Sequence, residues 1–267
     1  MKVWTVSNQK GGVGKTTTVV TLGGLLSSWG FRTLLVDLDP HGALTAYFRM
    51  NPDEVKASVY NLFHDASLKK KNSSPEPYIS PTEFDGLSIL PASTAIATLD
   101  RQVASMSGMG LVINNALHKV SGRYDYVLID SPPMLGVLMI NALAACQQLI
   151  IPVLAEYLAI KGLERMMHTL NMVFKSRIHA PRYTIVPTMF DKRTRAAQES
   201  LRVLQEQYPT YLWHSMIPID TKIRDASKQG VPLSIYMPES KAVEAYSALL
   251  DQLLLHDSQP AKQTASV

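Results

Sequence analysis

Short apolar runs alternate with longer segments of helical periodicity along most of this chain. The apolar runs predict strands at Val3–Ser7, Thr33–Asp37, Leu87–Leu90, Tyr126–Asp130, Leu149–Val153 and Thr184–Pro187. Most of the segments between them are long enough to hold a crossover helix. The alternation therefore predicts an α/β fold of three layers, in which helices cover both faces of a mostly parallel, twisted sheet. Because the strands are apolar at successive positions, both faces of the sheet should be buried.

Two segments depart from this pattern. Residues 66–82 contain the run Lys69–Lys71, followed by Asn, Ser and three prolines, a composition that predicts an exposed loop. A lysine run of this kind is more often solvated than bound to an anionic partner. The polar residues 257–267 are expected to form a disordered tail, which leaves residues 1–256 as a single domain.

The stretch Met134–Ala155 carries no formal charge and is long enough to suggest a membrane span. Pro152 lies inside it, however, and would break a spanning helix. The pattern favours a helix over 136–146 followed by a buried strand over 149–153. We therefore expect no stable insertion into a membrane.

Composition narrows the function classes only in part. Lys and Arg number 26 against 22 Asp and Glu, a net charge of +4, which permits a nucleic acid or an anionic surface as a partner but does not require one. Cys146 is the only cysteine. This excludes a disulfide within the chain and a multi-cysteine metal cluster, and it makes a reducing cytoplasm the natural compartment. The small neighbours of Cys146 predict a buried thiol.

The strongest chemical signal directly follows the first predicted strand. Glycines there let backbone N–H groups turn inward around phosphate oxygens, and the next helix points its N-terminus at the same anion. Lys15 would contact the β- and γ-phosphates, and the Thr16 hydroxyl would be a ligand of Mg²⁺. The candidate phosphate-binding residues are Lys10, Gly11, Gly12, Val13, Gly14, Lys15, Thr16 and Thr17. This order of strand, glycine-rich turn, lysine, threonine and helix predicts a P-loop.

Carboxylates at the ends of two predicted strands are candidates for a metal site beside this loop. Asp130 ends an apolar strand at its carboxyl end, where α/β sheets place their ligands, and we expect it to hold Mg²⁺ through water. Asp37 ends another strand, and Asp39 follows two residues later.

Lys10, at the entry to the loop, has the spacing of the signature lysine of the deviant P-loop ATPases. Through this residue the chain resembles that family, which includes ParA, MinD and the nitrogenase iron protein. The resemblance runs from the first strand to about Asp251. It is carried by residues 35–42, 124–133, 187–194, 218–232 and 239–246, of which 187–194 and 218–232 match the ParA branch specifically. The chain thus resembles the short ParA-type partition ATPases that have no N-terminal DNA-binding domain.

The resemblance implies roles for individual residues. In this family the lysine at the position of Lys10 reaches across a dimer interface to the partner's ATP. Asp39 would orient the attacking water and contact the metal shell, with Asp37 as the alternative, so that Lys10, Lys15 and Asp39 become the candidate catalytic residues and Thr16, Asp39 and Asp130 the candidate metal site. His41 stands where the family usually has Gln.

The resemblance also implies where the base and the DNA would bind. The adenine of ATP would lie near Met189, Pro218 and Asp220, the last at a position where the family more often has Asn. In the ParA branch, basic residues come together at the dimer edge and contact DNA phosphates without sequence preference. The corresponding candidates here are Arg193, Arg195, Lys222, Arg224 and Lys228. Lys222 and Ile219 stand where Arg is frequent in the family.

The resulting hypothesis is an ATP-dependent molecular switch. ATP and Mg²⁺ would drive homodimerisation, the dimer would bind nonspecific duplex DNA at the nucleoid, and hydrolysis stimulated by a ParB-like or other cargo adaptor would release it. The cargo could be a chromosome, a plasmid or a protein cluster such as a chemoreceptor array. One alternative is a MinD-like membrane-associated or flagellar-number regulatory ATPase. The other is a soluble ATP-dependent enzyme of the same superfamily.

The last predicted helix, about residues 240–256, helps to separate these alternatives. Its apolar residues recur at helical spacing, and it carries little positive charge. A helix that lies on a membrane surface needs a basic polar face. We therefore expect this helix to pack in the core.

Overall fold

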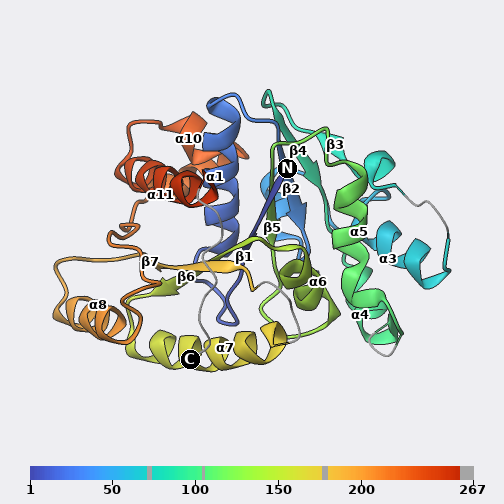
Figure 1. The fold of residues 1–267 in the computed structure, drawn as a ribbon. Coiled ribbons are helices and arrows are strands. Elements are labelled where there is room, and N and C mark those ends of the chain that lie inside the picture. Colours follow the sequence, from blue (N-terminus) through green and yellow to red (C-terminus); the bar gives the residue numbers. More distant parts are fainter. Residues whose placement is uncertain (71–73, 104–105, 176–179, 259–267) are drawn as a thin grey trace.

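The computed structural model describes residues 1–70, 74–103, 106–175 and 180–258 (Figure 1). These residues form a seven-stranded sheet in the order β3-β4-β2-β5-β1-β6-β7. The strands are β1 (Lys2–Val6), β2 (Thr33–Asp37), β3 (Ser80–Pro81), β4 (Leu87–Leu90), β5 (Tyr126–Asp130), β6 (Gln148–Leu154) and β7 (Arg182–Thr188). All pairs are parallel except β3 with β4. The predicted fold class is confirmed, and β3 is the one strand that the apolar pattern did not predict.

Alternate residues of each central strand pack on opposite faces of this sheet, as the period of two requires. In β1, Trp4 and Val6 join one apolar cluster, whereas Val3 joins the cluster on the other face. In β5, Leu128 and Ile129 divide in the same way. The central strands therefore need apolar residues at successive positions, which is the pattern found in the sequence.

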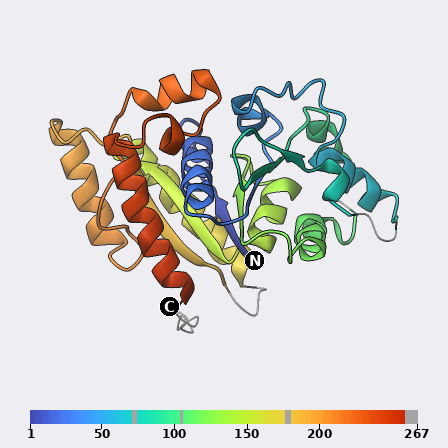
Figure 2. The ribbon, with the colours of Figure 1, turned by 90° about the horizontal axis from the view of Figure 1, so that it is seen from above.

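Helices cover both faces (Figures 1 and 2). On one face the long helix α1 (Lys15–Ser28) packs with α10 (Leu233–Tyr236) and α11 (Lys241–Ser258). On the other face lie α3 (Val59–Ser67), α5 (Val112–Lys119) and α6 (Val137–Ala145), with α7 (Tyr157–Phe174) against β6 and β7. The remaining helices are α2 (Ala43–Tyr47), α4 (Ile96–Val103), α8 (Arg195–Gln207), α9 (Lys222–Gln229) and the short 3₁₀ turns η1 (Glu76–Tyr78) and η2 (Met109–Leu111).

The last helix, α11, packs in the core, as its spacing predicted. Its buried side chains are Ala242, Val243, Tyr246, Leu249, Leu250 and Leu253, and the Tyr246 hydroxyl lies 2.9 Å from Thr18 Oγ1 of α1. The helix continues past the predicted boundary at residue 256, because Asp257 accepts a hydrogen bond of 3.2 Å from the indole of Trp4. The rest of the predicted tail, residues 259–267, lies outside the described residues.

The segment over residues 66–82 is more ordered than predicted. The Asp65 carboxylate accepts bonds from Lys70 Nζ at 2.8 Å and Tyr78 Oη at 3.0 Å, which closes the segment upon itself. Pro81 then lies in the edge strand β3, where no ladder N–H is needed on the outer side. Residues 71–73, which include Lys71 of the lysine run, fall outside the described part of the chain. The described residues of the segment are exposed or half-buried apart from Pro75, as predicted, although η1 and β3 lie within the predicted loop.

The uncharged stretch Met134–Ala155 divides into α6 and β6, as predicted. Cys146 lies between them in the core with 2% of its surface exposed, which confirms the buried thiol. Among the helices of the described residues, none combines the length and the apolar character needed to cross a membrane.

Candidate nucleotide-binding site

The loop between β1 and α1 has the backbone shape of a phosphate cradle. Gly12 and Gly14 adopt left-handed conformations, with φ of 73° and 89°, that other residues rarely adopt. A Cβ atom placed on Gly11 or Gly12 would meet no atom within 4 Å, so the loop borders open space. Gly14 is the N-cap of α1, and the first N–H groups of a helix favour an anion.

Side chains from neighbouring strands fix this loop in place. Thr188 Oγ1, at the end of β7, donates to the carbonyl of Val13 at 2.9 Å. Asn8 donates from Nδ2 to the carbonyl of Pro152 at 2.7 Å, while its Oδ1 accepts from the N–H of Lys10 at 2.9 Å. Asn8 and Thr188 are both buried. These two supporting residues could not be predicted from the sequence, because a single polar residue near a strand end has no pattern that marks it.

Thr16 and Asp130 meet where β5 ends beside α1. Thr16 Oγ1 donates to Asp130 Oδ2 at 2.6 Å. The other carboxylate oxygen, Oδ1, is buried and has no hydrogen-bond partner among the described residues. A buried oxygen without a partner is costly unless a ligand completes it. A hydroxyl and a carboxylate oxygen suit a hard cation such as Mg²⁺, which usually keeps several waters and binds phosphate oxygens as well.

The electrostatics of this edge favour a bound cation. Asp37 and Asp130 are neighbours in the register of β2 and β5. Burial raises the pKa of Asp130 well above its usual range, and the charge of Asp37 contributes in the same direction. Burial likewise raises the pKa of Asp37. Described His, Cys, Asp and Glu side chains form no group of three that could hold a metal by themselves. A cation here would therefore take ligands from nucleotide and water as well.

Asp37 and Asp39 differ in how much of each carboxylate is already engaged. Asp37 is fully buried; its Oδ2 accepts from the N–H and Oγ1 of Thr45 at 2.8 and 2.7 Å, and its Oδ1 accepts from the Asp39 N–H at 3.1 Å. The Asp39 side chain is 14% exposed and meets the backbone N–H and Nδ1 of the exposed His41 through one oxygen, Oδ1. Asp37 thus anchors α2, while Asp39 is accessible to solvent.

Lys10 lies on the rim of the site, held by one exposed ion pair. Its Nζ lies 3.1 Å from Glu156 Oε2, and the two side chains are 32% and 62% exposed. Large apolar side chains in the segments that follow β5 and β6 are also exposed, namely Met134, Leu135, Tyr157 and Leu158. Nothing within the described chain covers them. Such residues at one edge are typical of an interface.

The residues predicted around the adenine come together in part. An isolated bridge pairs Phe190 with Pro218, which places Met189 and Pro218 on adjacent segments. Met189 has a φ of 50°, and its Cε lies 3.9 Å from a Cβ atom built on Gly14, so this side chain reaches the P-loop. Asp220 instead accepts from the N–H groups of Lys222 and Ala242 at 2.9 and 3.3 Å. It joins the start of α9 to the start of α11.

The predicted DNA contacts lie on two helices and directly before one of them. Arg195 is the first residue of α8 and Arg193 precedes the helix, while Lys222, Arg224 and Lys228 are on α9; all five are exposed. Arg193 forms a two-bond ion pair with Asp191, and Lys222 lies 3.5 Å from Asp225. The bridge between Phe190 and Pro218 links the segments that lead into the two helices.

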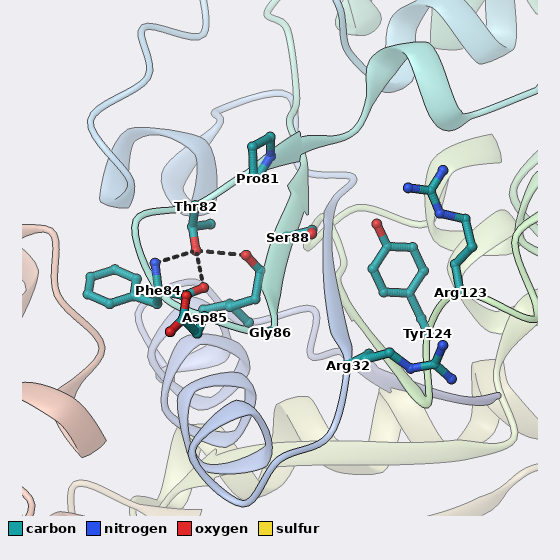
Figure 3. A pocket seen from close by; sticks show the side chains of 10 residues that line it. Arg32, Pro81, Thr82, Phe84, Asp85, Gly86, Ser88, Arg123 and Tyr124 are labelled. Atoms are coloured by element: carbon teal, nitrogen blue, oxygen red, sulfur yellow. Dashed lines mark hydrogen bonds between the residues drawn. The ribbon is translucent and has the colours of Figure 1, made fainter.

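A cavity of about 300 Å³ lies at the opposite edge of the sheet, where β2, β4 and β5 begin (Figure 3). Two of its cations are already neutralised. Arg32 pairs with Asp125 at 2.8 Å, and Arg123 pairs with Glu76 at 2.9 Å. The hydroxyl of Thr82 is also engaged, by the backbone of Phe84 and Leu87. This cavity therefore offers a phosphate no free cation among these residues.

The fold and the loop geometry define a P-loop nucleoside triphosphatase, and comparisons with known proteins specify the family. A family model described as an AAA domain matches residues 1–181. The chain is 31% identical to the chromosome partitioning protein ParA of Myxococcus xanthus, over 95% of this chain and 88% of that protein. It is 32% identical to the sporulation initiation inhibitor protein Soj of Bacillus subtilis, over 94% and 98% of the two chains. The chain belongs to the ParA-type P-loop ATPases, which confirms the resemblance found in its sequence.

Solved structures agree with this assignment. The cobyrinic acid a,c-diamide synthase of Mycobacterium smegmatis, with a bound ATP analogue and magnesium, superposes with a TM-score of 0.83 at 30% identity over the whole of both chains. The apo form of the Cyanothece protein McdA gives a TM-score of 0.82 at 23% identity, over 94% of this chain and 99% of that one. The second likeness bears on the fold alone.

Proposed function

We propose that this protein is an ATP-driven switch that dimerises around ATP, binds duplex DNA without sequence preference and leaves it after hydrolysis. The observation that carries the proposal is the P-loop edge itself. It combines an open glycine cradle, a nearly buried Lys15 and a carboxylate oxygen of Asp130 that has no partner within the described residues.

The residues of this edge suit ATP with Mg²⁺. Lys15 would contact the β- and γ-phosphates, while Thr16 and Asp130 would hold the metal, the latter through water. Mg²⁺, when bound, supplies charge neutralisation at the phosphates. Asp39 would orient a water toward the γ-phosphorus, so that the new bond to water forms as the bond to ADP breaks. The M. smegmatis structure with an ATP analogue and magnesium supports this pair of cofactors.

Dimerisation is supported by the rim of the site. Lys10 has a single exposed partner, Glu156, and could exchange it for a phosphate of ATP bound to a second copy. The exposed side chains of Met134, Leu135, Tyr157 and Leu158 would be buried by the same contact. A two-fold interface would bring each of these groups into contact twice.

DNA binding is supported by the basic residues of α8 and α9. They are exposed and lie on linked segments, which is the arrangement that phosphate contacts need. A dimer doubles these contacts, so the ATP-bound state should bind more tightly than the monomer. The M. xanthus relative is named a chromosome partitioning protein, which favours a chromosome or plasmid as the cargo. We further propose a ParB-like adaptor that stimulates hydrolysis, and a place at the nucleoid.

A second candidate function comes from the M. smegmatis structure, which is named as a synthase of a small molecule. A soluble ATP-dependent enzyme would use the same P-loop without DNA. A membrane-bound switch would need a basic surface helix, whereas most apolar side chains of α11 are buried in the core.

The test is a mobility shift with random-sequence duplex DNA beside sedimentation with anionic liposomes. Each is run with a slowly hydrolysed ATP analogue, with ADP and without nucleotide. We expect much tighter DNA binding with the analogue than with ADP or without nucleotide, and a steep loss of affinity with salt because counterions are released. Liposome binding without DNA binding would overturn the proposal in favour of a membrane switch. Binding to neither would favour the soluble enzyme.

Two double variants test whether the proposed basic surface binds DNA. Lys222→Ala with Arg224→Ala, and Arg193→Ala with Arg195→Ala, should each weaken binding on all sequences alike and reduce the salt slope by about 1 for each phosphate contact removed. Basal ATPase activity should survive both changes. The matched control, Arg32→Ala with Arg123→Ala, removes the same charge at the opposite edge and should leave DNA affinity unchanged.

A further inference from the structure

The C-terminal end of α9 is held by two residues from a distant part of the chain. Arg49 donates from Nε to the Gln229 carbonyl at 3.1 Å and from Nη2 to the Gln229 and Lys228 carbonyls at 2.8 and 3.4 Å. Tyr47 Oη donates to the Val231 carbonyl at 2.9 Å. The last carbonyls of a helix have no partner within it, and a cation there is favourable. Arg49 caps α9, and Tyr47 holds the chain just beyond its end.

The backbone at this cap is fixed tightly. Arg49 has a φ of 61°, in the left-handed region that residues other than glycine rarely adopt. Such a conformation persists only where its surroundings determine it. A Cβ atom on Gly230 would lie 2.9 Å from Arg49 Nε and 3.0 Å from the carbonyl of Tyr47. The contact therefore leaves little room for independent movement of the two segments.

The residues that hold the end of α9 are also tied to the nucleotide edge. Tyr47 is the last residue of α2, and Thr45 of the same helix binds both to the carboxylate of Asp37 and, through Oγ1, to the N–H of Ala92. Asp37 in turn accepts from the N–H of Asp39. A movement of the loop at Asp39 would thus be passed through α2 to the cap.

Helix α9 itself depends on its ends. It has eight residues, of which Ala226 is buried and Ile223 is half-buried against the core, so only one narrow face of the helix is packed. Its N-terminal end is joined by Asp220 to α11, and its C-terminal end by Arg49 to the segment after α2. The anchor at α11 is part of the core, whereas the anchor at Arg49 is connected through α2 to the nucleotide site.

We infer that Arg49 is a positioning residue that couples the state of the nucleotide site to the orientation of the basic helix α9. The consequence for DNA rests on the proposed function, because α9 carries Lys222, Arg224 and Lys228. Arg49 would set how these side chains are presented in the ATP-bound dimer, in addition to the doubling of contacts that dimerisation brings.

The experiment compares the wild type with Arg49→Gly, Arg49→Lys and the control Arg123→Ala. Glycine removes the cap but suits the positive φ, so the variant should fold. Lysine keeps the charge but cannot reproduce the guanidinium fork. Four quantities are measured: ATP affinity, dimer mass by light scattering, DNA affinity with the ATP analogue and with ADP, and hydrogen exchange of residues 222–230 with each nucleotide and no DNA.

We expect wild-type residues 222–230 to exchange differently with the ATP analogue and with ADP. Arg49→Gly should keep ATP affinity and dimerisation, lose this difference in exchange, and lose about fivefold or more of the ATP-over-ADP preference for DNA, a typical size for coupling between sites. Arg49→Lys should resemble Arg49→Gly, and Arg123→Ala should resemble the wild type.

Three results would overturn the inference. The first is hydrogen exchange over residues 222–230 of the wild type that is the same with the ATP analogue and with ADP. The second is an Arg49→Gly protein that matches the wild type in all four measurements. The third is full DNA affinity in Arg49→Lys with loss only in Arg49→Gly, which would make Arg49 a direct phosphate contact. If the exchange responds to ATP in the wild type and not in Arg49→Gly, yet no protein binds DNA, the inference stands and the proposed function fails.

Discussion

The two edges of the sheet hold charged side chains in opposite ways. At the edge where the parallel strands end, Lys15 and Asp130 are buried, and Asp130 Oδ1 has no partner within the described chain. At the other edge, Arg32 and Arg123 line a cavity of about 300 Å³, but each already has a carboxylate partner. The presence of a cavity therefore does not by itself identify the nucleotide-binding site. Buried polar atoms without a hydrogen-bond partner identify it better.

The physical reason is the cost of those incomplete atoms. A buried polar oxygen without a hydrogen bond destabilises the folded state, and a ligand that completes it returns that free energy on binding. Exposed ion pairs such as the one between Arg32 and Asp125 cost little and contribute little. The first edge should therefore respond strongly to substitution and ligand, and the second only weakly.

The largest effect is expected from Lys15→Ala. Removing a nearly buried cation from the phosphate cradle should lower ATP affinity by about 100-fold or more, since truncating one partner of a buried charge pair costs several kcal/mol. Titration with a fluorescent ATP analogue measures this. Lys161→Ala, at an exposed ion pair on α7, is the matched control and should bind ATP as the wild type does. Wild-type affinity in Lys15→Ala would refute the assignment of the P-loop.

Asp39→Ala and Asp37→Ala should separate chemistry from structure. Asp39→Ala should slow hydrolysis by about 100-fold, the usual contribution of a positioned acid or base, and leave ATP bound and the dimer trapped. Asp37→Ala should instead lower stability by about 1–3 kcal/mol or more, because it strands the three donors on Thr45 and Asp39. Steady-state phosphate release and thermal denaturation distinguish the two. Unchanged turnover in Asp39→Ala would move the water-orienting role away from Asp39.

Lys10→Ala should prevent dimerisation without changing the affinity for ATP. If Lys10 exchanges Glu156 for the ATP of a second copy, the variant keeps its ATP affinity but remains a monomer with the slowly hydrolysed analogue. Light scattering measures the mass. The paired variant Glu156→Gln removes the competing carboxylate and should dimerise at least as readily as the wild type. A normal dimer of Lys10→Ala would contradict the role in trans.

The sequence predicted the parts of this molecule that depend on local pattern. The apolar runs located six of the strands, because strands buried on both faces need successive apolar residues. Glycines before Lys15 located the cradle, because few other residues adopt the positive φ of Gly12 and Gly14. Both signals lie within a few residues of the feature that they predict.

The parts that were missed depend on contacts between distant residues. Strand β3 is only Ser80–Pro81, held by β4 and not by its own composition. Asn8 and Thr188 support the loop through partners 144 and 175 residues away. The same holds for Arg49, whose bonds to Gln229 cross 180 residues. No local pattern contains such information.

The smallest effect is expected at the second edge, from Arg32→Ala. The Arg32 guanidinium lowers the pKa of Asp125 to about 2 through a side-chain hydrogen bond of 2.8 Å. Because an aspartate in the unfolded chain has a pKa of about 3.9, the ionised carboxylate is more stable in the folded state. The pair therefore contributes its stability above about pH 4 and loses it as the pH falls toward 2. Both side chains are more than a third exposed, so solvent screening keeps this contribution small.

We expect Arg32→Ala to melt slightly below the wild type at pH 7, with the two melting temperatures converging as the pH is lowered from 4 to 2. Circular dichroism melts across this range measure the difference, and the ATP titration of the same variant should match the wild type. A clear loss of ATP affinity in Arg32→Ala would show that the two edges are not independent.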